Sequence, residues 1–349
     1  MEFLFEYGLF LAKAVTLVIA IAVTLGLILS LIMKHSGKGE GKGELKIVSI
    51  SDNLKDMQTF AQQSLLSNEE RKAFVKAEKK KAKAEKKTKK TNDNDQDTKA
   101  HKVFVIDFNG SMQAEEVEAL RREVTAILSV ATKDDEVVVR LESGGGVVHG
   151  YGLAAAQLQR IKDAEVSLTV TIDKVAASGG YMMACVADKI ISANFAIIGS
   201  IGVVAQIPNI HKLLKKNDID IEMHTAGEYK RTLTLLGKNT DEGREKFKAE
   251  LEAVHVMFKD FVANNRPDLD ISKVATGEYW YGLDALKLGL VDALSTSDDV
   301  LLELNKSHHV YKVSYTEKKN LAEKLGLAAE SSVLRIVQKV LQTTPRPSV

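Results

Sequence analysis

The sequence predicts an α/β fold. From residue 103 onward, runs rich in β-branched residues alternate with stretches whose apolar residues recur at helical spacing. The runs are almost continuously apolar, which is typical of strands buried on both faces of a parallel sheet. The chain has 349 residues, 45% of them hydrophobic, which is enough for one large domain or two ordinary ones. Its single cysteine excludes an internal disulfide, so the fold must depend on its core.

An apolar segment lies near the N-terminus. Residues 14–33 are 20 residues without a charge, and as a helix they would measure roughly 30 Å, the thickness of a bilayer core. A cleaved signal peptide is the alternative, but Glu2 and Glu6 make a poor basic leader, and no small-residue cleavage pattern precedes Lys34. We therefore expect a retained transmembrane anchor over residues 1–34.

The lysines on either side of this segment bear on its orientation. Lys13 precedes the segment, and lysines at positions 34, 38, 42 and 46 follow it. This bias favours a cytoplasmic location for the rest of the chain. Long domains are translocated regardless of such charges, so a periplasmic location stays open.

Residues 35–100 are expected to form a spacer and a charged helical arm. A glycine- and lysine-rich stretch leads to a short strand, 45–50, and a helix over 53–90. Residues 71–90 hold 11 basic and 2 acidic residues with almost no apolar stripe, which indicates a solvated helix. Anionic lipid would suit this charge. A nucleic acid would too, but the stretch KAEKKKAKAEKKTKK contains no aromatic residue to stack on bases, and we expect no nucleic-acid partner.

Residues 101–305 are expected to form the globular domain, and residues 306–349 a C-terminal strand and helices. The predicted strands of the domain are VFVIDF (103–108), EVVVRLES (136–143), VSLTVTI (166–172), DKIISA (188–193), AIIGSIGVVAQI (196–207) and IDIEMHTA (219–226). The predicted helices are 114–130, 150–163, one that begins near Ser178, 240–264, and a short one that ends at Gly289. Strand 309–314 and helices 317–325 and 330–341 complete the chain.

Three glycine-bearing turns follow strands of this domain. They are SGGG (143–146), SGG (178–180) and GSIG (199–202). Glycine allows the backbone to take positive φ or to approach a ligand closely, so such a turn can present N–H groups to an oxyanion. Neither phosphate-binding fingerprint is met, because no lysine and hydroxyl residue follow the glycines and the G-x-G-x-x-G spacing is absent. Taken alone, SGGG is a weak signal, and it is more typical of a simple tight turn.

Ser178 lies where a strand ends and an alanine- and methionine-rich helix begins. This arrangement is similar to the elbow that carries a nucleophile between strand and helix, although Ala176 stands where G-x-S-x-G has its first glycine. A serine there benefits from the helix dipole. A helix N-cap serine prefers the same position, so local features leave both interpretations open.

A serine nucleophile needs a base. None of the eight histidines lies between residues 181 and 210, and His149, just after SGGG, is the one that could serve. A lysine is the other candidate: Lys230 in AGEYKR follows the predicted strand 219–226, and Arg231 beside it would favour the neutral amine. Lys174, four residues before Ser178, is a weaker candidate.

Five motifs in this order resemble the signal peptide peptidase A family of membrane-bound serine peptidases. They are SGGG, DKVAASGGYMMA, IIGSIGV, AGEYKR and YWYGLDALKLGLVD, behind an N-terminal apolar segment, and the resemblance covers residues 102–294. It implies a Clp/crotonase type of α/β fold, with no cofactor and no metal. One departure is Gly144, where related folds usually have proline.

The resemblance also implies a role for each matching residue. Ser178 would be the nucleophile of a Ser-Lys dyad and Lys230 its general base. Ser200 of GSIGV would hydrogen-bond and position that lysine, and the backbone N–H groups of Gly146 and Gly179 would bind the oxyanion.

The function expected from the resemblance is a membrane-anchored serine endopeptidase of the bacterial inner membrane. It would form an acyl-enzyme and degrade small or extended polypeptides such as remnant signal peptides. Short members of this family assemble into rings in which serine and lysine come from neighbouring protomers, and since this chain has one core, the resemblance implies such a homo-oligomer. Two alternatives are an acyl-CoA enzyme of the crotonase type, against which the dyad and anchor argue, and a non-catalytic membrane scaffold.

Overall fold

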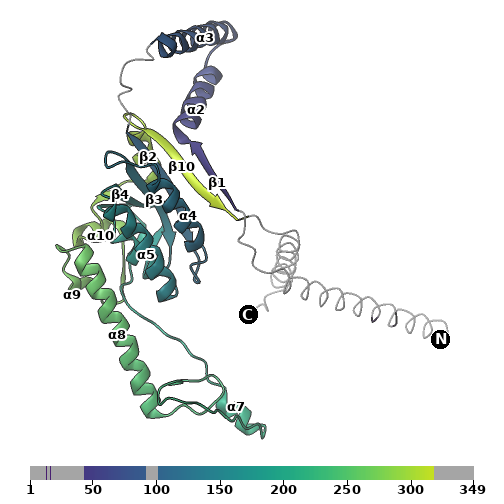
Figure 1. Ribbon diagram of the computed structural model, residues 1–349, viewed down its shortest axis with the longest axis vertical. Coiled ribbons are helices and arrows are strands. Elements are labelled where there is room, and N and C mark those ends of the chain that lie inside the picture. The colour runs from purple at the N-terminus through teal and green to yellow at the C-terminus, as the bar shows by residue number, and fades with distance from the viewer. Residues whose placement is uncertain (1–12, 14–15, 17–42, 92–100, 318–349) are drawn as a thin grey trace, which may run out of the picture. The chain divides into compact units, whose positions relative to one another are not determined.

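The computed structural model describes residues 13, 16, 43–91 and 101–317 (Figure 1). One compact unit, Leu45–Tyr315, contains nearly all of them. The expected anchor at 14–33 lies outside the described residues except for Thr16, and so do the C-terminal helices expected at 317–325 and 330–341 except for Glu317. None of the described helices combines the length and the apolar character that crossing a membrane requires.

A mainly parallel sheet forms the centre of the unit. Its main path runs in the order β1 (Glu44–Ser49), β10 (His309–Thr316), β2 (Lys102–Gly110), β3 (Glu136–Ser143), β4 (Ser167–Ile172), β6 (Lys189–Ser192) and β9 (Ala293–Leu294). Strands β10 through β9 pair in parallel, which requires crossover connections. Strand β1 comes from the segment expected to be a spacer and arm, and it pairs with β10.

The sheet branches beside β4. Strand β5 (Val175–Ala177) leaves β4 and pairs with β3 and with β7 (Ile197–Gly199). Strand β7 in turn pairs antiparallel with β8 (Tyr279–Tyr281). Because β3 and β5 are in register at Ser143 and Ala176, the turn that follows β3 and the residues that follow β5 lie side by side.

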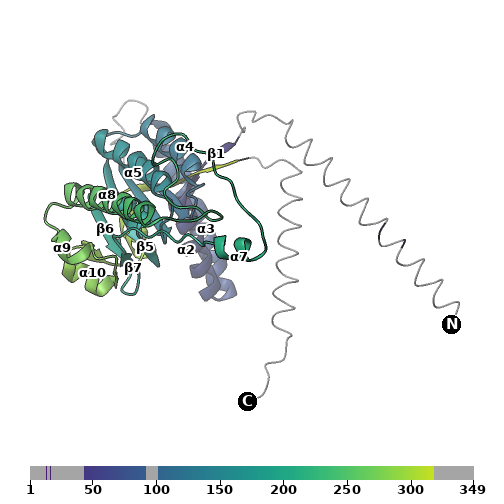
Figure 2. The same cartoon turned by 90° about the horizontal axis from the view of Figure 1, so that it is seen from below.

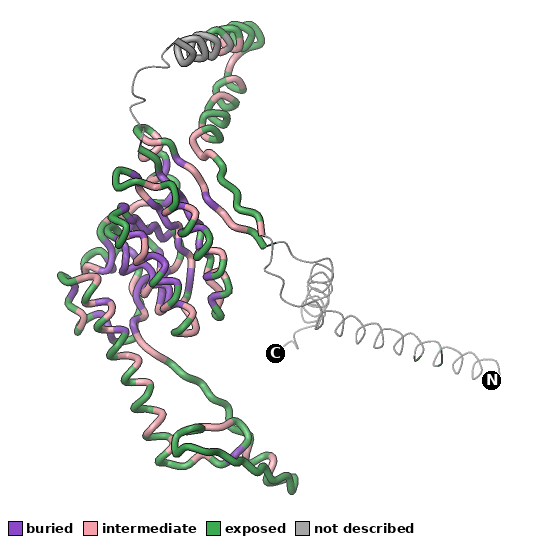
Figure 3. Tube along the Cα trace, in the orientation of Figure 1, coloured by how far each residue is buried: buried purple, intermediate pink, exposed green. Residues whose placement is uncertain are grey.

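The main core fills one face of the sheet, under α4 (Val117–Leu128), α5 (Val148–Asp163) and α6 (Gly179–Ala184) (Figure 3). Alternate residues of each strand point to this face. In β2 and β3 these residues are Phe104, Ile106, Phe108, Val137, Val139 and Leu141. The other face carries a smaller apolar cluster under α11 (Ser297–Leu304), and farther along β2 and β3 it is polar. Burial on both faces is therefore confirmed for only part of each strand.

Most predicted elements are confirmed, with three differences. The strand predicted over 196–207 is shorter, because only β7 (Ile197–Gly199) forms and residues 200–207 belong to no strand. The helix expected over 53–90 is two helices, α2 (Ile50–Leu65) and α3 (Asn68–Thr91), because Ser67 exchanges capping hydrogen bonds with Glu70 and starts a new helix. The strand predicted at 219–226 is wrong. These residues form no strand and are exposed, because no neighbouring strand satisfies their backbone.

Four further helices follow α6. The short helices are α7 (His211–Lys216), α9 (Ile271–Val274) and α10 (Gly282–Leu288), and the long one is α8 (Asp241–Asn265) (Figure 2). Helix α8 confirms the prediction over 240–264, and Thr240 caps it by accepting a hydrogen bond from the Gly243 N–H at 3.0 Å. Helix α10 ends at Gly289. The φ of this residue is 81°, a value that glycine adopts more readily than any other residue.

Glu123 of α4 is a buried acid at the end of the core. Its side chain accepts a hydrogen bond from the Tyr315 N–H at 2.7 Å, and the residue is 6% exposed. Burial raises the pKa of Glu123 from 4.5 to about 7. Because the folded-state pKa is raised, stability that the neutral acid provides is complete below pH 4.5 and is lost as the pH rises through about 7.

We expect Glu123→Gln to stabilise the protein at alkaline pH. Glutamine keeps an oxygen that accepts from Tyr315 but cannot ionise. The difference in free energy of unfolding between the variant and wild type should therefore change by about 2 kcal/mol in favour of the variant between about pH 5 and 8. Urea unfolding of both proteins across this range measures the difference. Glu118→Gln, on the exposed side of the same helix, is the control. An effect of Glu123→Gln on stability that does not change with pH would contradict the raised pKa of Glu123.

Candidate active site

Ser178 lies between β5 and α6 in an unusual backbone conformation. Its φ is 52° and its ψ −119°, which a residue with a side chain adopts only where the surrounding structure holds it. Its N–H donates to the Gly199 carbonyl at 2.8 Å. Although Ser178 occupies the N-cap position of α6, its side chain makes no capping hydrogen bond. The hydroxyl is therefore available for another role, and capping does not explain the serine.

The glycine turn after β3 packs directly against Ser178. Gly145 has φ 85°, and a Cβ at this position would lie 2.6 Å from the Gly179 nitrogen and 2.7 Å from the Ser178 Cβ. Only glycine allows this approach, because any side chain would overlap both residues. The first glycine of the turn differs: a Cβ at Gly144 would have no atom within 4 Å.

A buried hydroxyl network holds the glycine turn in place. The Ser143 Oγ accepts from the Gly145 N–H at 3.1 Å and lies 2.5 Å from the Tyr151 hydroxyl. Tyr151, fully buried in α5, donates to the Ser111 carbonyl at 2.8 Å. Sequence reasoning missed Tyr151 and Ser111. A tyrosine one helical turn after a glycine turn is a weak signal without the tertiary contacts.

Two backbone N–H groups near Ser178 have no acceptor within the described part of the chain. Gly179 is the first residue of α6, so its N–H has no intrahelical acceptor. The N–H of Gly146 also donates no hydrogen bond, although its neighbour Val147 donates to the Met112 carbonyl at 2.9 Å. Unsatisfied N–H groups beside a serine can stabilise a developing oxyanion.

Ser200 follows Gly199, the residue whose carbonyl holds the Ser178 N–H. Its φ is 52°, its N–H donates to the Glu278 carbonyl at 2.7 Å, and it is half-buried. Its hydroxyl makes no hydrogen bond to any described residue. The structure thus brings together four of the five predicted site residues: Ser178, Gly179, Gly146 and Ser200.

Lys230 is the fifth predicted residue, and its side chain is not bonded to the others within one chain. It is exposed, in the irregular segment between α7 and α8, and its ammonium forms no hydrogen bond or ion pair with the described residues. The neighbouring Tyr229 ring lies 5.0 Å from the ammonium of Lys246 in α8.

The competing bases are less suitable. His149 is exposed in the first turn of α5 and makes no hydrogen bond to a described residue. Lys174 is committed to Glu142, with 2.9 Å between its ammonium and the carboxylate.

Among the described residues, no group of three or more histidine, cysteine or acidic side chains could hold a metal ion.

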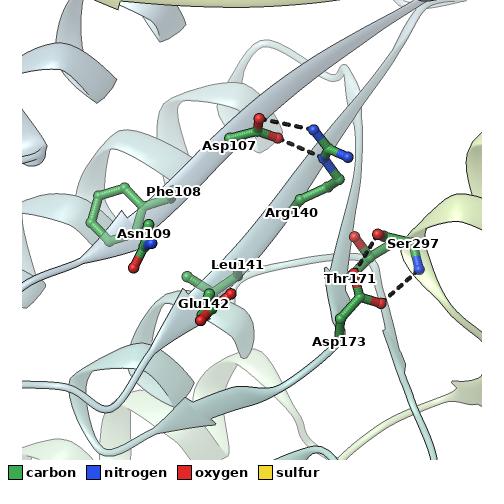
Figure 4. Close-up of a pocket in the computed structure, with 9 residues that line it drawn as sticks. All are labelled: Asp107, Phe108, Asn109, Arg140, Leu141, Glu142, Thr171, Asp173 and Ser297. Atoms are coloured by element: carbon green, nitrogen blue, oxygen red, sulfur yellow. Dashed lines mark hydrogen bonds and ion pairs between the residues drawn. The ribbon is translucent and has the colours of Figure 1, made fainter.

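A separate hollow of about 260 Å³ lies on the polar part of the other sheet face (Figure 4). Its lining includes an Arg140 guanidinium that donates to Asp107 at 2.6 and 2.8 Å, and an Asp173 carboxylate that accepts from the Ser297 N–H at 2.8 Å. Arg140 and Asp107 thus pair with each other, Asp173 is held by Ser297, and none of the predicted site residues lines the hollow. We therefore assign it no part in the chemistry at Ser178.

Comparison with known proteins supplies evidence about the family of this chain that does not depend on the geometry of the site. The model of the peptidase family S49 N-terminal region matches residues 2–158, and that of peptidase family S49 matches residues 160–311. A protein named Probable protease SohB from Haemophilus influenzae is 55% identical over 300 residues, which are 85% of each chain. One of the same name from Buchnera aphidicola subsp. Schizaphis graminum is 46% identical over 341 residues, 97% of this chain and 98% of its own.

Solved structures were compared as well. The membrane-bound stomatin-specific protease 1510-N superposes with a TM-score of 0.39 and 14% identity, covering 58% of this chain and 84% of its own. ClpP1 from Listeria monocytogenes superposes with a TM-score of 0.39 and 15% identity, covering 56% of this chain and 94% of its own.

Proposed function

The chain belongs to peptidase family S49 and is a serine peptidase, and we propose that it is an endopeptidase that works by a Ser178–Lys230 dyad. The observation that carries the assignment of Ser178 is its free hydroxyl, held on a strained turn beside two unsatisfied N–H groups. Lys230 is assigned by the resemblance of AGEYKR to the motif of this family.

The reaction follows from these groups. The neutral Lys230 amine accepts the Ser178 proton as the Ser178 Oγ attacks the scissile carbonyl carbon. The N–H groups of Gly146 and Gly179 stabilise the negative charge that forms on the carbonyl oxygen. The protonated lysine then gives its proton to the leaving amine, and an acyl-enzyme remains on Ser178. Water, deprotonated by the same lysine, hydrolyses this ester. The Ser200 hydroxyl, which has no described partner, accepts from Lys230 and orients it.

We propose that Lys230 reaches Ser178 of a second copy in a homo-oligomer. Two features support this: the Lys230 ammonium is unbonded to the described residues of its own chain, and the stretch between β7 and α8, which contains Lys230, exposes many apolar side chains to solvent. The exposed fractions are 91% for Val204, 59% for Leu213, 49% for Ile219, 44% for Ile221 and 49% for Met223. Exposed apolar side chains gathered in one segment mark an interaction surface.

The type of fold, the cellular location and the substrate are further parts of this proposal. The branching of β5 and β7 away from a parallel sheet supports a Clp/crotonase type of core. The uncharged residues 14–33 support a single-pass anchor in the bacterial inner membrane. The lysines that follow them favour a cytoplasmic catalytic domain. The proposed substrates are small or unfolded polypeptides, including signal peptides that have been cut off, as the resemblance of the motifs implies.

A fluorophosphonate probe tests the proposed chemistry. We expect purified protein to become labelled, and mass spectrometry to locate the adduct on Ser178, because the probe reacts with an activated serine and its oxyanion enters the same N–H groups. Ser178→Ala should remove the label, and Ser129→Ala, at an exposed serine after α4, should keep it. An adduct on another serine, or no adduct on a folded protein that also hydrolyses no peptide, would overturn the assignment. The second result would favour a scaffold or acyl-CoA enzyme.

A further inference from the structure

Helix α3 is the most highly charged element of the chain. Ten lysines and one arginine lie between residues 71 and 90, against two glutamates, which is about two positive charges per helical turn. Lys72, Lys76 and Lys80 are exposed and form no ion pair with a described residue. The peptidase mechanism makes no use of this charge.

We propose that α3 binds the surface of bilayers rich in anionic phospholipid. Over its 24 residues the helix extends about 36 Å, so it can lie along a membrane and contact many headgroups. Lysine suits this target, because its ammonium is a hydrated point charge that needs no fixed geometry from its partner. Nucleic acid is the less suitable ligand, since the lysine-rich stretch 76–90 has no aromatic residue to stack on bases and no arginine to pair with them.

Helix α2 supports a membrane surface as the occupant. It has no buried residue, and it exposes Met57, Phe60 and Leu65 by 66%, 74% and 88%. At 100° per residue, Met57 and Leu65 lie about 80° apart and Asp52 lies about 140° from each of them, while Phe60 lies about 60° from Met57 on the edge that borders Asp56. An amphipathic helix next to a lysine-rich one is typical of segments that lie in the headgroup region. Since Ser67 caps α3 directly after α2, the two helices form one continuous module.

The position of the module in the chain places it near a bilayer. Strand β1 begins at Glu44, ten residues after the apolar segment 14–33, and ten residues span at most about 35 Å. If 14–33 is the anchor proposed above, α2 and α3 are held close to headgroups at a high effective concentration. This step depends on the anchor proposal and not on the peptidase activity.

The test uses the full chain in nanodiscs, with a fluorophore on α3. The native Cys185 is fully buried, so Ala84→Cys provides the reactive thiol. One set of discs contains only phosphatidylcholine, and the other about one-third phosphatidylglycerol; both carry a headgroup quencher. We expect at least about threefold stronger quenching in the anionic discs, and loss of the difference at about 1 M salt, where screening is short-ranged. Equal quenching in both discs, as when α3 docks on acidic parts of a second copy, would overturn the proposal.

Two charge-matched variants separate a local effect from one of net charge. In the first, four lysines of α3 become glutamine: Lys79, Lys80, Lys83 and Lys87. In the second, the change is made at four exposed lysines that pair with acids elsewhere: Lys133, Lys273, Lys287 and Lys306. Glutamine preserves helix propensity, so α3 should persist. The first variant should lose the lipid dependence and the second should keep it, and the reverse result would refute the assignment.

A competition experiment addresses nucleic acid. Adding RNA at the same phosphate concentration as the anionic lipid should leave the quenching largely unchanged. If RNA removes it, nucleic acid is the preferred ligand and the proposal is wrong. Fluorophosphonate labelling of the same discs reports the peptidase site separately, so a failure at α3 is distinguishable from a failure at Ser178.

Discussion

Replacing either Ser178 or Lys230 by alanine is expected to lower kcat/KM for peptide hydrolysis by roughly 10⁴-fold or more, and replacing both should cost little beyond either one. In the proposed dyad the nucleophile and the base act as one unit, so the loss of one leaves the other without a function. Steady-state hydrolysis of a fluorogenic peptide measures the three variants. Lys238→Ala changes another exposed lysine of the same segment and should keep near-wild-type activity.

Mixing the two inactive variants tests where the base comes from. If Ser178 and Lys230 of one site belong to neighbouring protomers, random co-assembly of equal amounts restores about one quarter of the sites. Co-assembly is verified with two affinity tags before activity is measured. Full inactivity of a verified mixed oligomer would place both residues in one chain and refute the shared site.

The second large effect is expected from Gly145→Ala. A Cβ at Gly145 would meet the Gly179 nitrogen at 2.6 Å and the Ser178 Cβ at 2.7 Å, and φ 85° disfavours any side chain. The turn must therefore move away from Ser178, and the two N–H groups proposed to bind the oxyanion would separate. We expect kcat to fall by roughly 10²- to 10³-fold, the cost of losing an oxyanion donor, with fluorophosphonate labelling slowed similarly.

Gly144→Ala is the matched control for this change. A Cβ at Gly144 has no atom within 4 Å, and its φ lies outside the left-handed region, so activity should stay within a few-fold of wild type. Circular dichroism and Tm confirm that both variants fold. Equal activities of the two variants would show that the contact between Gly145 and Gly179 has no role in catalysis.

Local sequence patterns predicted much of the fold. The apolar runs at 103–108, 136–143 and 166–172 correspond to β2, β3 and β4, because alternation between strand and helix periods records which residues are buried. The same kind of reasoning failed at 219–226, where alternating isoleucines and a methionine predict a strand that is not formed. A strand needs a hydrogen-bonded neighbour, and local periodicity does not record whether one exists.

For the candidate site, too, some features are predicted by local sequence and others are not. Sequence patterns alone indicate that Ser178 follows a strand, that glycines surround it, and that no histidine lies between residues 181 and 210. The folded structure was needed to show that Gly145 packs against Ser178 and Gly179, that Tyr151 and Ser143 hold the glycine turn, and that the hydroxyl of Ser178 caps no helix. The contacts of Gly145 join it to residues about thirty positions away through the register of β3 with β5, and such pairing is set by the packing of the whole sheet.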